Sequence, residues 1–185
     1  RREIFLGGQD AEVFRRNVQE LIEQGPTSDE VDEFLQGFSG LMNQPVVGDL
    51  FYGNPLGAWH DYRGSVEPVR TRTGIPLARA SIGTTAPELY RGDKDQSAFQ
   101  RLKAKAQLTR YGGDAYFFCV MAAGHIDIAL DANLQTYDIA PLLPIVTGAG
   151  GVAAEWRGGN PADGGHVITA GSQALLDEAL AILQG

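Results

Sequence analysis

Apolar residues recur at regular spacing through most of the chain, and turn-forming residues separate the segments. In residues 10–24 apolar side chains recur every three or four positions with charged ones between them, which predicts an amphipathic helix. Gly25 and Pro26 end that helix. A second apolar stripe follows, and Thr27 with Glu30 has the spacing of a capping box at its start. Residues 1–40 are therefore predicted to form a helical hairpin whose stripes need a surface to cover.

From residue 41 onward, strand patterns and helix patterns alternate. Segments 45–52 and 58–62 flank a turn-forming sequence, which predicts a β-hairpin. Further strands are predicted at 78–83, 108–111, 126–130, 152–156 and 166–170, and helices at 95–106, 115–123, 137–147 and 172–183. Pro144 lies inside the third of these helices and predicts a kink there. The alternation predicts a layered α/β domain over residues 41–185.

Charge narrows the range of partners. The 185 residues carry a formal net charge of -8, whereas proteins that bind nucleic acid present a basic stripe to the phosphate backbone. Lys103 and Lys105 belong to the densest basic stretch, which is typical of the solvated face of a helix. We therefore expect no nucleic-acid partner.

Cysteine and apolar content indicate the compartment. Cys119 is the single cysteine, so an intrachain disulfide and a multi-cysteine zinc site are both excluded, and its apolar surroundings predict a buried, inert thiol. The first residues lack the apolar core of a signal peptide, and no apolar run approaches the ~20 residues that span a bilayer. We expect a cytoplasmic protein that does not associate with membranes.

Three carboxylates mark the region where chemistry is predicted. Asp114 follows a double glycine, Asp131 ends a predicted strand, and Asp138 begins a predicted helix. Strand ends and helix starts face the ligand crevice in open α/β sheets, where carboxylates bind hard cations and helix N-termini attract phosphate. A divalent metal with a phosphate is the functional interpretation, although an aspartate at a helix start is more often only a cap.

Other candidate motifs have simpler structural interpretations. The glycine-rich sequence 148–151 lacks the lysine of a P-loop and follows a helix, so a helix C-cap and turn is the better interpretation. His60, His125 and His166 lack metal-ligand spacing and have no evident serine or cysteine partner. The polar stretch 158–165 is predicted to be the loop between two strands.

Several ordered motifs lie in the second half of the chain, among them 110–116 (Arg-Tyr-Gly-Gly-Asp-Ala-Tyr) and 124–127 (Gly-His-Ile-Asp). These motifs resemble the inositol monophosphatase superfamily of magnesium-dependent phosphomonoesterases, and most of all its histidinol-phosphate phosphatase branch. Residues 137–141 (Tyr-Asp-Ile-Ala-Pro) match the family's Trp-Asp signature with tyrosine replacing tryptophan, and 148–151 match its Gly-Ala-Gly-Gly element. The resemblance covers residues 41–183 and implies the C-terminal half of that fold.

The resemblance implies roles for individual residues. Asp138 matches a ligand of the second magnesium ion, and Asp131 matches an acidic residue, usually glutamate, that contacts substrate hydroxyl or amine groups. Gly113, Asp114 and Ala115 match the turn that lies against the substrate. The implied substrate is a small phosphate ester, and Asp114 is suited to pair with a cationic amine. Neither the composition nor the resemblance identifies a catalytic residue.

The motifs that supply most of the family's metal ligands do not occur in these 185 residues. These motifs are a Glu-Glu pair and Asp-Pro-(Ile/Leu)-Asp-Gly-Thr. The sequence 160–165 (Asn-Pro-Ala-Asp-Gly-Gly) resembles the second motif only in part, because it begins with an amide and ends without threonine. Magnesium needs near-octahedral oxygen coordination, so Asp138 with water and phosphate would bind it weakly or not at all. We expect an impaired phosphatase, and the alternative is a non-catalytic binding or assembly module derived from one.

The resemblance also predicts an apolar face on residues 41–185 that the absent half would cover. A soluble monomer rarely exposes such a face. Either the apolar stripes of residues 1–40 or a second chain would cover it, and we expect a homodimer in addition to the hairpin.

Overall fold

A four-stranded antiparallel sheet forms the start of the described chain. The structure, a computed structural model, describes residues 40–54 and 56–185. The predicted hairpin is confirmed, because Gly53 pairs with Ala58 across its turn. Residues 46 and 47 belong to an earlier turn, so the first strand of the hairpin begins at Asp49. The strands lie in the order β1 (Gly40–Gln44), β2 (Asp49–Asn54), β3 (Gly57–Tyr62) and β4 (Ser65–Pro68).

A five-stranded mixed sheet forms the centre of the molecule. Its strands lie in the order β6 (Leu108–Tyr111), β5 (Ser81–Thr84), β7 (Ile128–Leu134), β9 (Gly165–Ala170) and β8 (Val152–Glu155). The pairs of β5 with β6 and with β7 are parallel, whereas β9 is antiparallel to both of its neighbours. The carboxyl ends of β5 and β7 therefore reach the same edge of the sheet, which is where ligand sites form in open α/β sheets.

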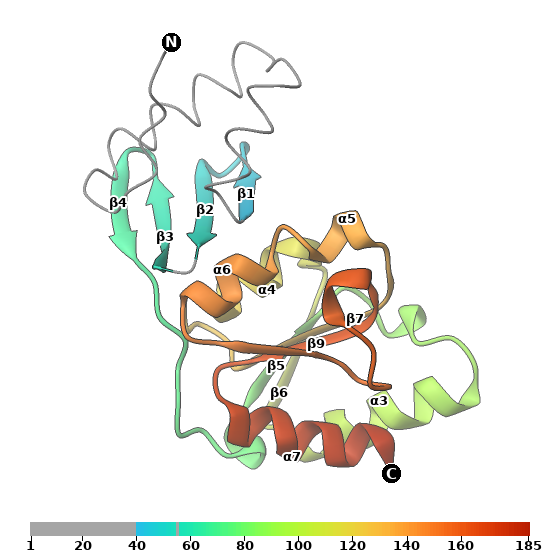
Figure 1. Ribbon diagram of the computed structural model, residues 1–185. Coiled ribbons are helices and arrows are strands. Elements are labelled where there is room, and N and C mark those ends of the chain that lie inside the picture. Colours follow the sequence, from blue (N-terminus) through green and yellow to red (C-terminus); the bar gives the residue numbers. More distant parts are fainter. Residues whose placement is uncertain (1–39, 55) are drawn as a thin grey trace.

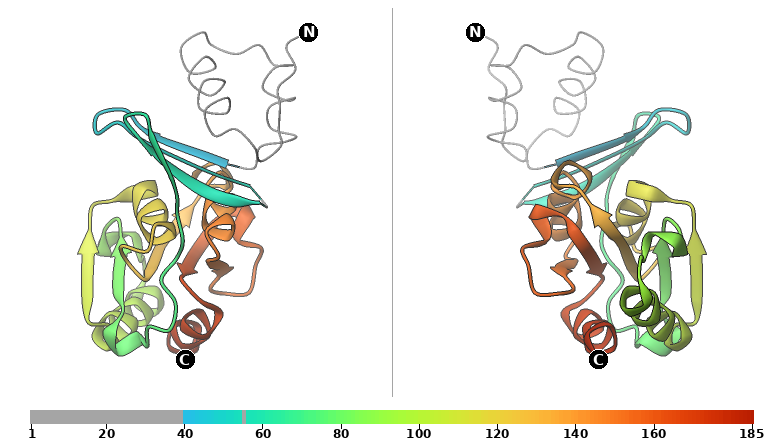
Figure 2. Two further views of the ribbon diagram at one scale, coloured as in Figure 1. Left: turned by 90° about the vertical axis from the view of Figure 1, so that its left-hand side faces the viewer. Right: turned by 90° about the vertical axis from the view of Figure 1, so that its right-hand side faces the viewer.

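Helices cover both faces of the central sheet. The remaining elements are η1 (Leu77–Arg79), η2 (Pro87–Leu89), α3 (Asp93–Lys105), α4 (Asp114–Ala122), α5 (Thr136–Ile139), α6 (Leu143–Gly148), η3 (Pro161–Asp163) and α7 (Gln173–Gln184). One core lies between the sheet and α3 with α7, and a second lies between the sheet and α4 with α6. The sheet β1–β4 packs on the outer side of α4 and α6 (Figures 1 and 2). The layers thus alternate sheet, helices, sheet, helices, and the predicted α/β class is confirmed.

The single helix predicted over 137–147 is wrong. The chain forms two short helices instead, α5 and α6, with a turn between them. Pro144 lies at the start of α6, where a missing N–H costs no hydrogen bond, whereas in mid-helix it would leave a carbonyl unpaired. The predicted C-cap after α6 is confirmed, since Ala149 is the capping residue and Gly150 has a φ of +89°.

Glycines allow α6 to approach the hairpin closely. A Cβ atom built on Gly53 would lie 2.5 Å from Cα of Ile145, and one on Gly148 would lie 2.3 Å from the carbonyl oxygen of Gly57. Phe51 from β2 fills the same interface and is buried. The four-stranded sheet therefore covers the apolar face of α4 and α6 directly.

We predicted that residues 41–185 present an apolar face that the stripes of residues 1–40 or a second chain would cover. The sheet β1–β4 is part of this unit and packs on α4 and α6, so what covers the unit as a whole stays a prediction. The predicted helical hairpin lies outside the described residues, and the division at residue 40 and the homodimer stay predictions. Within residues 40–54 and 56–185, no helix combines the length and apolar character that crossing a bilayer requires.

Candidate functional site

Asp131 lies in a cradle of threonine donors at the edge of the central sheet. Its Oδ1 accepts hydrogen bonds from Oγ1 of Thr84 and from the backbone N–H of Thr85, both at 2.8 Å. Its Oδ2 accepts from Oγ1 of Thr85 at 2.7 Å. Thr84 is the last residue of β5, which pairs in parallel with β7, and Thr85 follows it directly. The parallel pairing thus brings together residues that are 46 and 47 positions apart in the chain.

A second layer of contacts fixes the cradle. The hydroxyl groups of Thr84 and Tyr90 lie 2.8 Å apart, and Tyr90 donates to the carbonyl oxygen of Leu130 at 3.2 Å. The Tyr90 ring stacks on Phe99 with ring centres 4.2 Å apart. Burial raises the pKa of the Tyr90 hydroxyl. Tyr90 therefore stays protonated and serves as a neutral hydrogen-bonding group.

Asp131 is a buried carboxylate without a cationic partner among the described residues. Its exposed fraction is 4%, and no Lys, Arg or His of the described chain forms an ion pair with it. Burial raises the pKa of Asp131, the bonds from Thr85 and Thr84 oppose this rise, and the charge of Asp114 adds to it. The site therefore favours an approaching positive charge.

The strand does not end where the sequence predicts. β7 continues three residues beyond Asp131 to Leu134, and the pairing with β9 is interrupted between these two positions. Asn133 in this interruption has a φ of +62°, in the left-handed region. Asp131 is thus an inner strand residue that precedes a bulge.

The glycine turn lies open to solvent at the start of α4. Gly112 has a φ of +89°, and Asp114 takes a left-handed φ of +43° as the first helical residue. The predicted cap by Asp114 is wrong, because Gly113 occupies the N-cap position. Asp114 and Ala115 are both exposed, and a Cβ on Gly113 would lie 2.4 Å from the ring of Phe117. The Asp114 carboxylate therefore remains available to a ligand.

Asp138 has a structural task in its own helix. Its Oδ2 accepts a hydrogen bond from the backbone N–H of Gln135 at 2.8 Å, and together they form a capping box at the start of α5. The residue is exposed. Across residues 40–54 and 56–185, no three carboxylate, imidazole or thiol groups converge as metal ligands. Asp138 and its described surroundings therefore do not fit a complete magnesium site.

Two other aspartates are used inside the fold. Asp127, immediately before β7, accepts two hydrogen bonds from Arg72 at 2.8 Å and two more from Ser81. Asp49 on β2 binds His60 at 2.7 Å and Tyr116 at 2.5 Å. The second group ties the four-stranded sheet to α4 through Tyr116, two residues after Asp114.

The remaining sequence candidates have structural roles. Cys119 is buried, and burial raises the pKa of its thiol, which agrees with the predicted inert cysteine. His166 binds Asp95, which lies in the first turn of α3 and is not its cap, because Gly92 occupies that position. The predicted loop between β8 and β9 is confirmed and contains η3.

The hydrogen bonds from Thr84 and Thr85 to Asp131 were not predicted from the sequence. Thr84 and Thr85 form an adjacent pair at the end of a predicted strand, which was the available signal. Their importance depends on the neighbouring strand, and strand order is not visible in local patterns. The charge of Asp114 contributes to the raised pKa of Asp131, whereas no described hydrogen bond joins Asp138 to either residue.

Comparison with known families decides the lineage. A family model described as the inositol monophosphatase family matches residues 36–184. The chain belongs to this family. A second model, described as a protein of unknown function (DUF3567), matches residues 1–48. The start of the chain therefore resembles a different family, and the two matches overlap over residues 36–48.

Curated relatives and solved structures agree with the inositol monophosphatase lineage. The chain is 29% identical to the chloroplastic bifunctional phosphatase IMPL2 of Arabidopsis thaliana, over 78% of this chain and 43% of that protein. It is 26% identical to the histidinol-phosphatase of Chlorobaculum parvum, over 74% of this chain and 51% of that protein. An inositol monophosphatase structure from Zymomonas mobilis superposes with a TM-score of 0.72 at 31% identity, covering 80% of this chain and 58% of that one. The chain thus spans about half the length of the curated relatives.

Proposed function

We propose that this chain provides the substrate-recognition half of a phosphomonoesterase of the histidinol-phosphate phosphatase type. The proposal rests on the Asp131 carboxylate, which is buried, accepts three hydrogen bonds and forms no ion pair with any described cation. A cationic amine on the substrate would offset the cost of burying this charge. The histidinol-phosphatase among the relatives supports this choice of substrate class.

Asp114 complements Asp131 at the proposed site. Asp131 is fixed by neighbouring donors, whereas the exposed Asp114 at the start of α4 adds a second negative charge. The unpaired backbone N–H groups of a helix start attract anions, so the turn Gly113–Ala115 is suited to contact the phosphate end of the ester. The described chain therefore offers a place for each end of an amine-bearing phosphate ester.

Hydrolysis requires more than these residues supply. Members of this family generally depend on magnesium, and bound magnesium would neutralise the phosphoryl oxygens. Asp138 matches a family ligand, but one of its oxygens is used in the capping box and no described group of three ligands surrounds it. We propose that the 185 residues alone bind magnesium weakly and hydrolyse esters slowly.

Phosphate release tests this proposal. Purified chain is incubated with histidinol phosphate or inositol phosphate, in magnesium or in EDTA, and free phosphate is measured. We expect slow release that needs magnesium, favours histidinol phosphate and disappears in Asp138→Asn.

The alternative is a non-catalytic binding module, and the absence of a three-ligand group among the described residues favours it. Binding of histidinol phosphate without any release at high protein concentration would support this alternative. If the chain neither binds histidinol phosphate nor releases phosphate from it, both proposals are overturned.

A further inference from the structure

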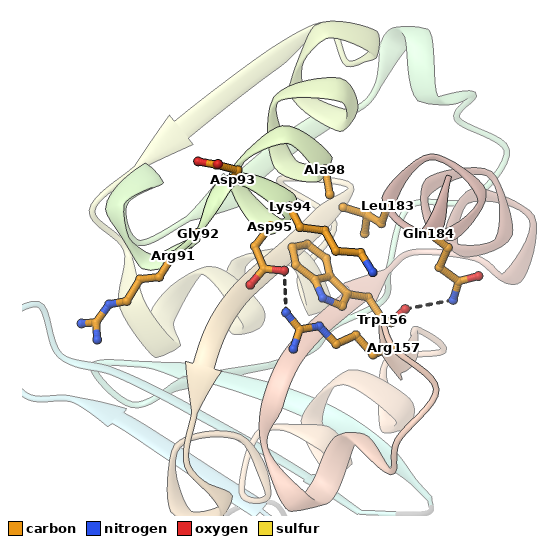
Figure 3. A pocket seen from close by; sticks show the side chains of 10 residues that line it. All are labelled: Arg91, Gly92, Asp93, Lys94, Asp95, Ala98, Trp156, Arg157, Leu183 and Gln184. Carbon is orange, nitrogen blue, oxygen red and sulfur yellow. Dashed lines mark hydrogen bonds and ion pairs between the residues drawn. The ribbon is translucent and has the colours of Figure 1, made fainter.

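A cavity of about 580 Å³ lies on the opposite side of the central sheet from α4 and α6. It opens between the start of α3, the end of β8 and the last turn of α7, as Figure 3 shows. None of Asp114, Asp131 and Asp138 lines it. The cavity is therefore separate from the proposed phosphatase site.

The lining of the cavity contains a hydrogen-bond donor on the side chain of a largely buried tryptophan. The exposed fraction of Trp156 is 5%, and its backbone carbonyl accepts a hydrogen bond from Gln184 at 2.9 Å. Its indole N–H donates to no group in the described part of the chain, and in Figure 3 the indole nitrogen faces the space between Lys94 and Arg157. A ligand in the cavity that accepts a hydrogen bond can therefore bind this donor.

Positive charge gathers around the same space. Lys94 has no ion-pair partner among the described residues, and its side chain extends across the cavity toward Trp156 (Figure 3). Arg157 uses only Nη2 in its described side-chain hydrogen bonds, to Asp95 at 2.5 Å and to His166 at 3.4 Å. The other guanidinium nitrogens keep donors for a ligand.

The acidic groups nearby do not repel an anion strongly. The two oxygens of Asp95 are occupied by Arg157 and His166. Asp93 also belongs to the lining, and in Figure 3 its carboxylate points away from Lys94 and Arg157. Glu155, which precedes Trp156, accepts hydrogen bonds from the backbone N–H groups of Arg157, Gly159 and His166. The lining as a whole contains three cations, Arg91, Lys94 and Arg157, and two aspartates, so positive charge is in excess.

The geometry points to a binding site for a small organic anion in this cavity. Its acidic group, a carboxylate or a phosphate, is held by Lys94, Arg157 and the indole N–H of Trp156. The cavity is several times larger than a bare phosphate ion, and Ala98 and Leu183 provide buried apolar contacts for an organic body. Arg157 is positioned by Asp95, so the site is built before the ligand arrives.

Nuclear magnetic resonance can observe the proposed donor directly. The full chain contains two tryptophans, so its ¹H–¹⁵N spectrum has two indole signals, and Trp59→Phe assigns the one from Trp156. Benzoate and phenyl phosphate serve as probes for the two acidic groups, and benzamide is the neutral counterpart. We expect saturable shifts of the Trp156 signal with at least one anion and no comparable shift with benzamide.

Matched variants separate this site from general charge effects. Lys94→Gln should weaken anion binding roughly tenfold, as expected for the loss of a charged hydrogen bond. Lys105→Gln removes the same charge from the other end of α3, and Asp138→Asn alters the proposed phosphatase site; both should retain the wild-type affinity.

The inference is overturned if no anion shifts the Trp156 signal at millimolar concentrations. It is also overturned if Lys94→Gln and Lys105→Gln weaken binding equally, because the charge at the cavity would then have no special role. Loss of the shift in Asp138→Asn but not in Lys94→Gln would assign the effect to the phosphatase site. These binding measurements do not depend on phosphate release, so they test the anion site separately from the proposed phosphatase function.

Discussion

Asp127 and Asp131 are buried aspartates four residues apart, yet their surroundings differ in kind. Asp127 is fully buried and accepts paired hydrogen bonds from the Arg72 guanidinium and two more from Ser81. Asp131 is almost as buried, but its donors are the neutral groups of Thr84 and Thr85. The charge of Asp127 is therefore neutralised by Arg72 within the fold, whereas Asp131 has no cationic partner among the described residues.

The pKa values of the two carboxyl groups are shifted in opposite directions. Burial acts to raise the pKa of Asp127, but the bonds from Arg72 and Ser81 outweigh it, so the pKa lies below its ordinary value. Burial raises the pKa of Asp131 above its ordinary value despite the threonine bonds. A compensated buried charge stabilises the fold, whereas an uncompensated one is a candidate for binding a ligand.

Removing the charge of Asp127 should have the largest effect on stability. Asp127→Asn leaves Arg72 without its partner and should lower the free energy of unfolding by roughly 2 to 3 kcal/mol at pH 7, toward the low end for a buried pair because Arg72 is half exposed. Urea unfolding measures this change. A carboxylate with a lowered pKa stabilises above its ordinary pKa, and this stabilisation is lost as the pH falls through the lowered value. The difference between wild type and variant should therefore shrink in acid, and a constant difference would contradict the ion-pair explanation.

The same substitution at Asp131 should act mainly on binding. Asp131→Asn should weaken binding of an amine-bearing phosphate ester roughly tenfold, and it should change the binding of a neutral ester little. Its stability should stay within about 1 kcal/mol of wild type at pH 7, because a neutral group relieves the cost of burying a charge.

The pH dependence of Asp131→Asn has the opposite sign to that of Asp127→Asn. A group with a raised pKa binds its proton more tightly in the folded state, so wild type loses stability as the pH rises from the ordinary carboxyl range through the raised value. The variant has no such titration, and its stability relative to wild type should improve with increasing pH. Unfolding curves at several pH values measure this trend, and a decline would show that Asp131 is compensated after all.

Asp138→Asn should have a smaller structural effect. The capping box loses its charged acceptor, and the expected cost is about 0.5 to 1 kcal/mol of the free energy of unfolding. Thermal unfolding measures this cost, with Asp177→Asn in α7 as an exposed control. A cost above 2 kcal/mol would mean that Asp138 has further partners in the fold.

Asp114→Asn should have the smallest effect. The side chain is exposed, so stability should change by no more than about 0.5 kcal/mol. Its charge acts on the ligand through solvent, and binding of the amine-bearing ester should weaken about two- to threefold. Titration calorimetry with histidinol phosphate measures both this variant and Asp131→Asn. A larger loss at Asp114 than at Asp131 would reverse the proposed ranking of the two carboxylates.

Local patterns predicted those elements whose signals lie within a few residues. The hairpin of β2 and β3, strand β6 and helix α4 appear where predicted. The helix predicted over 172–183 is α7, and Ser172 caps it by accepting a hydrogen bond from the backbone N–H of Leu175. Alternation and capping residues act over short distances, so the sequence alone reveals them.

The features that depend on packing were not predictable in this way. To predict the break before α6, one must know that starting a new helix near Pro144 is lower in free energy than kinking one long helix there. The cradle of Asp131 required the pairing of β5 with β7, and the compensation of Asp127 required Arg72, which is 55 positions away. The candidate acids were found from the sequence, but what distinguishes them comes from partners remote in the chain.

Titration calorimetry with histidinol phosphate and inositol phosphate on wild type and Asp131→Asn tests the central claim most directly. We expect wild type to bind the amine-bearing ester about tenfold more tightly than the neutral one, and the asparagine variant to lose this preference. An equal preference in both proteins, or none in wild type, would contradict the assignment of Asp131 as the group that recognises a cationic substrate.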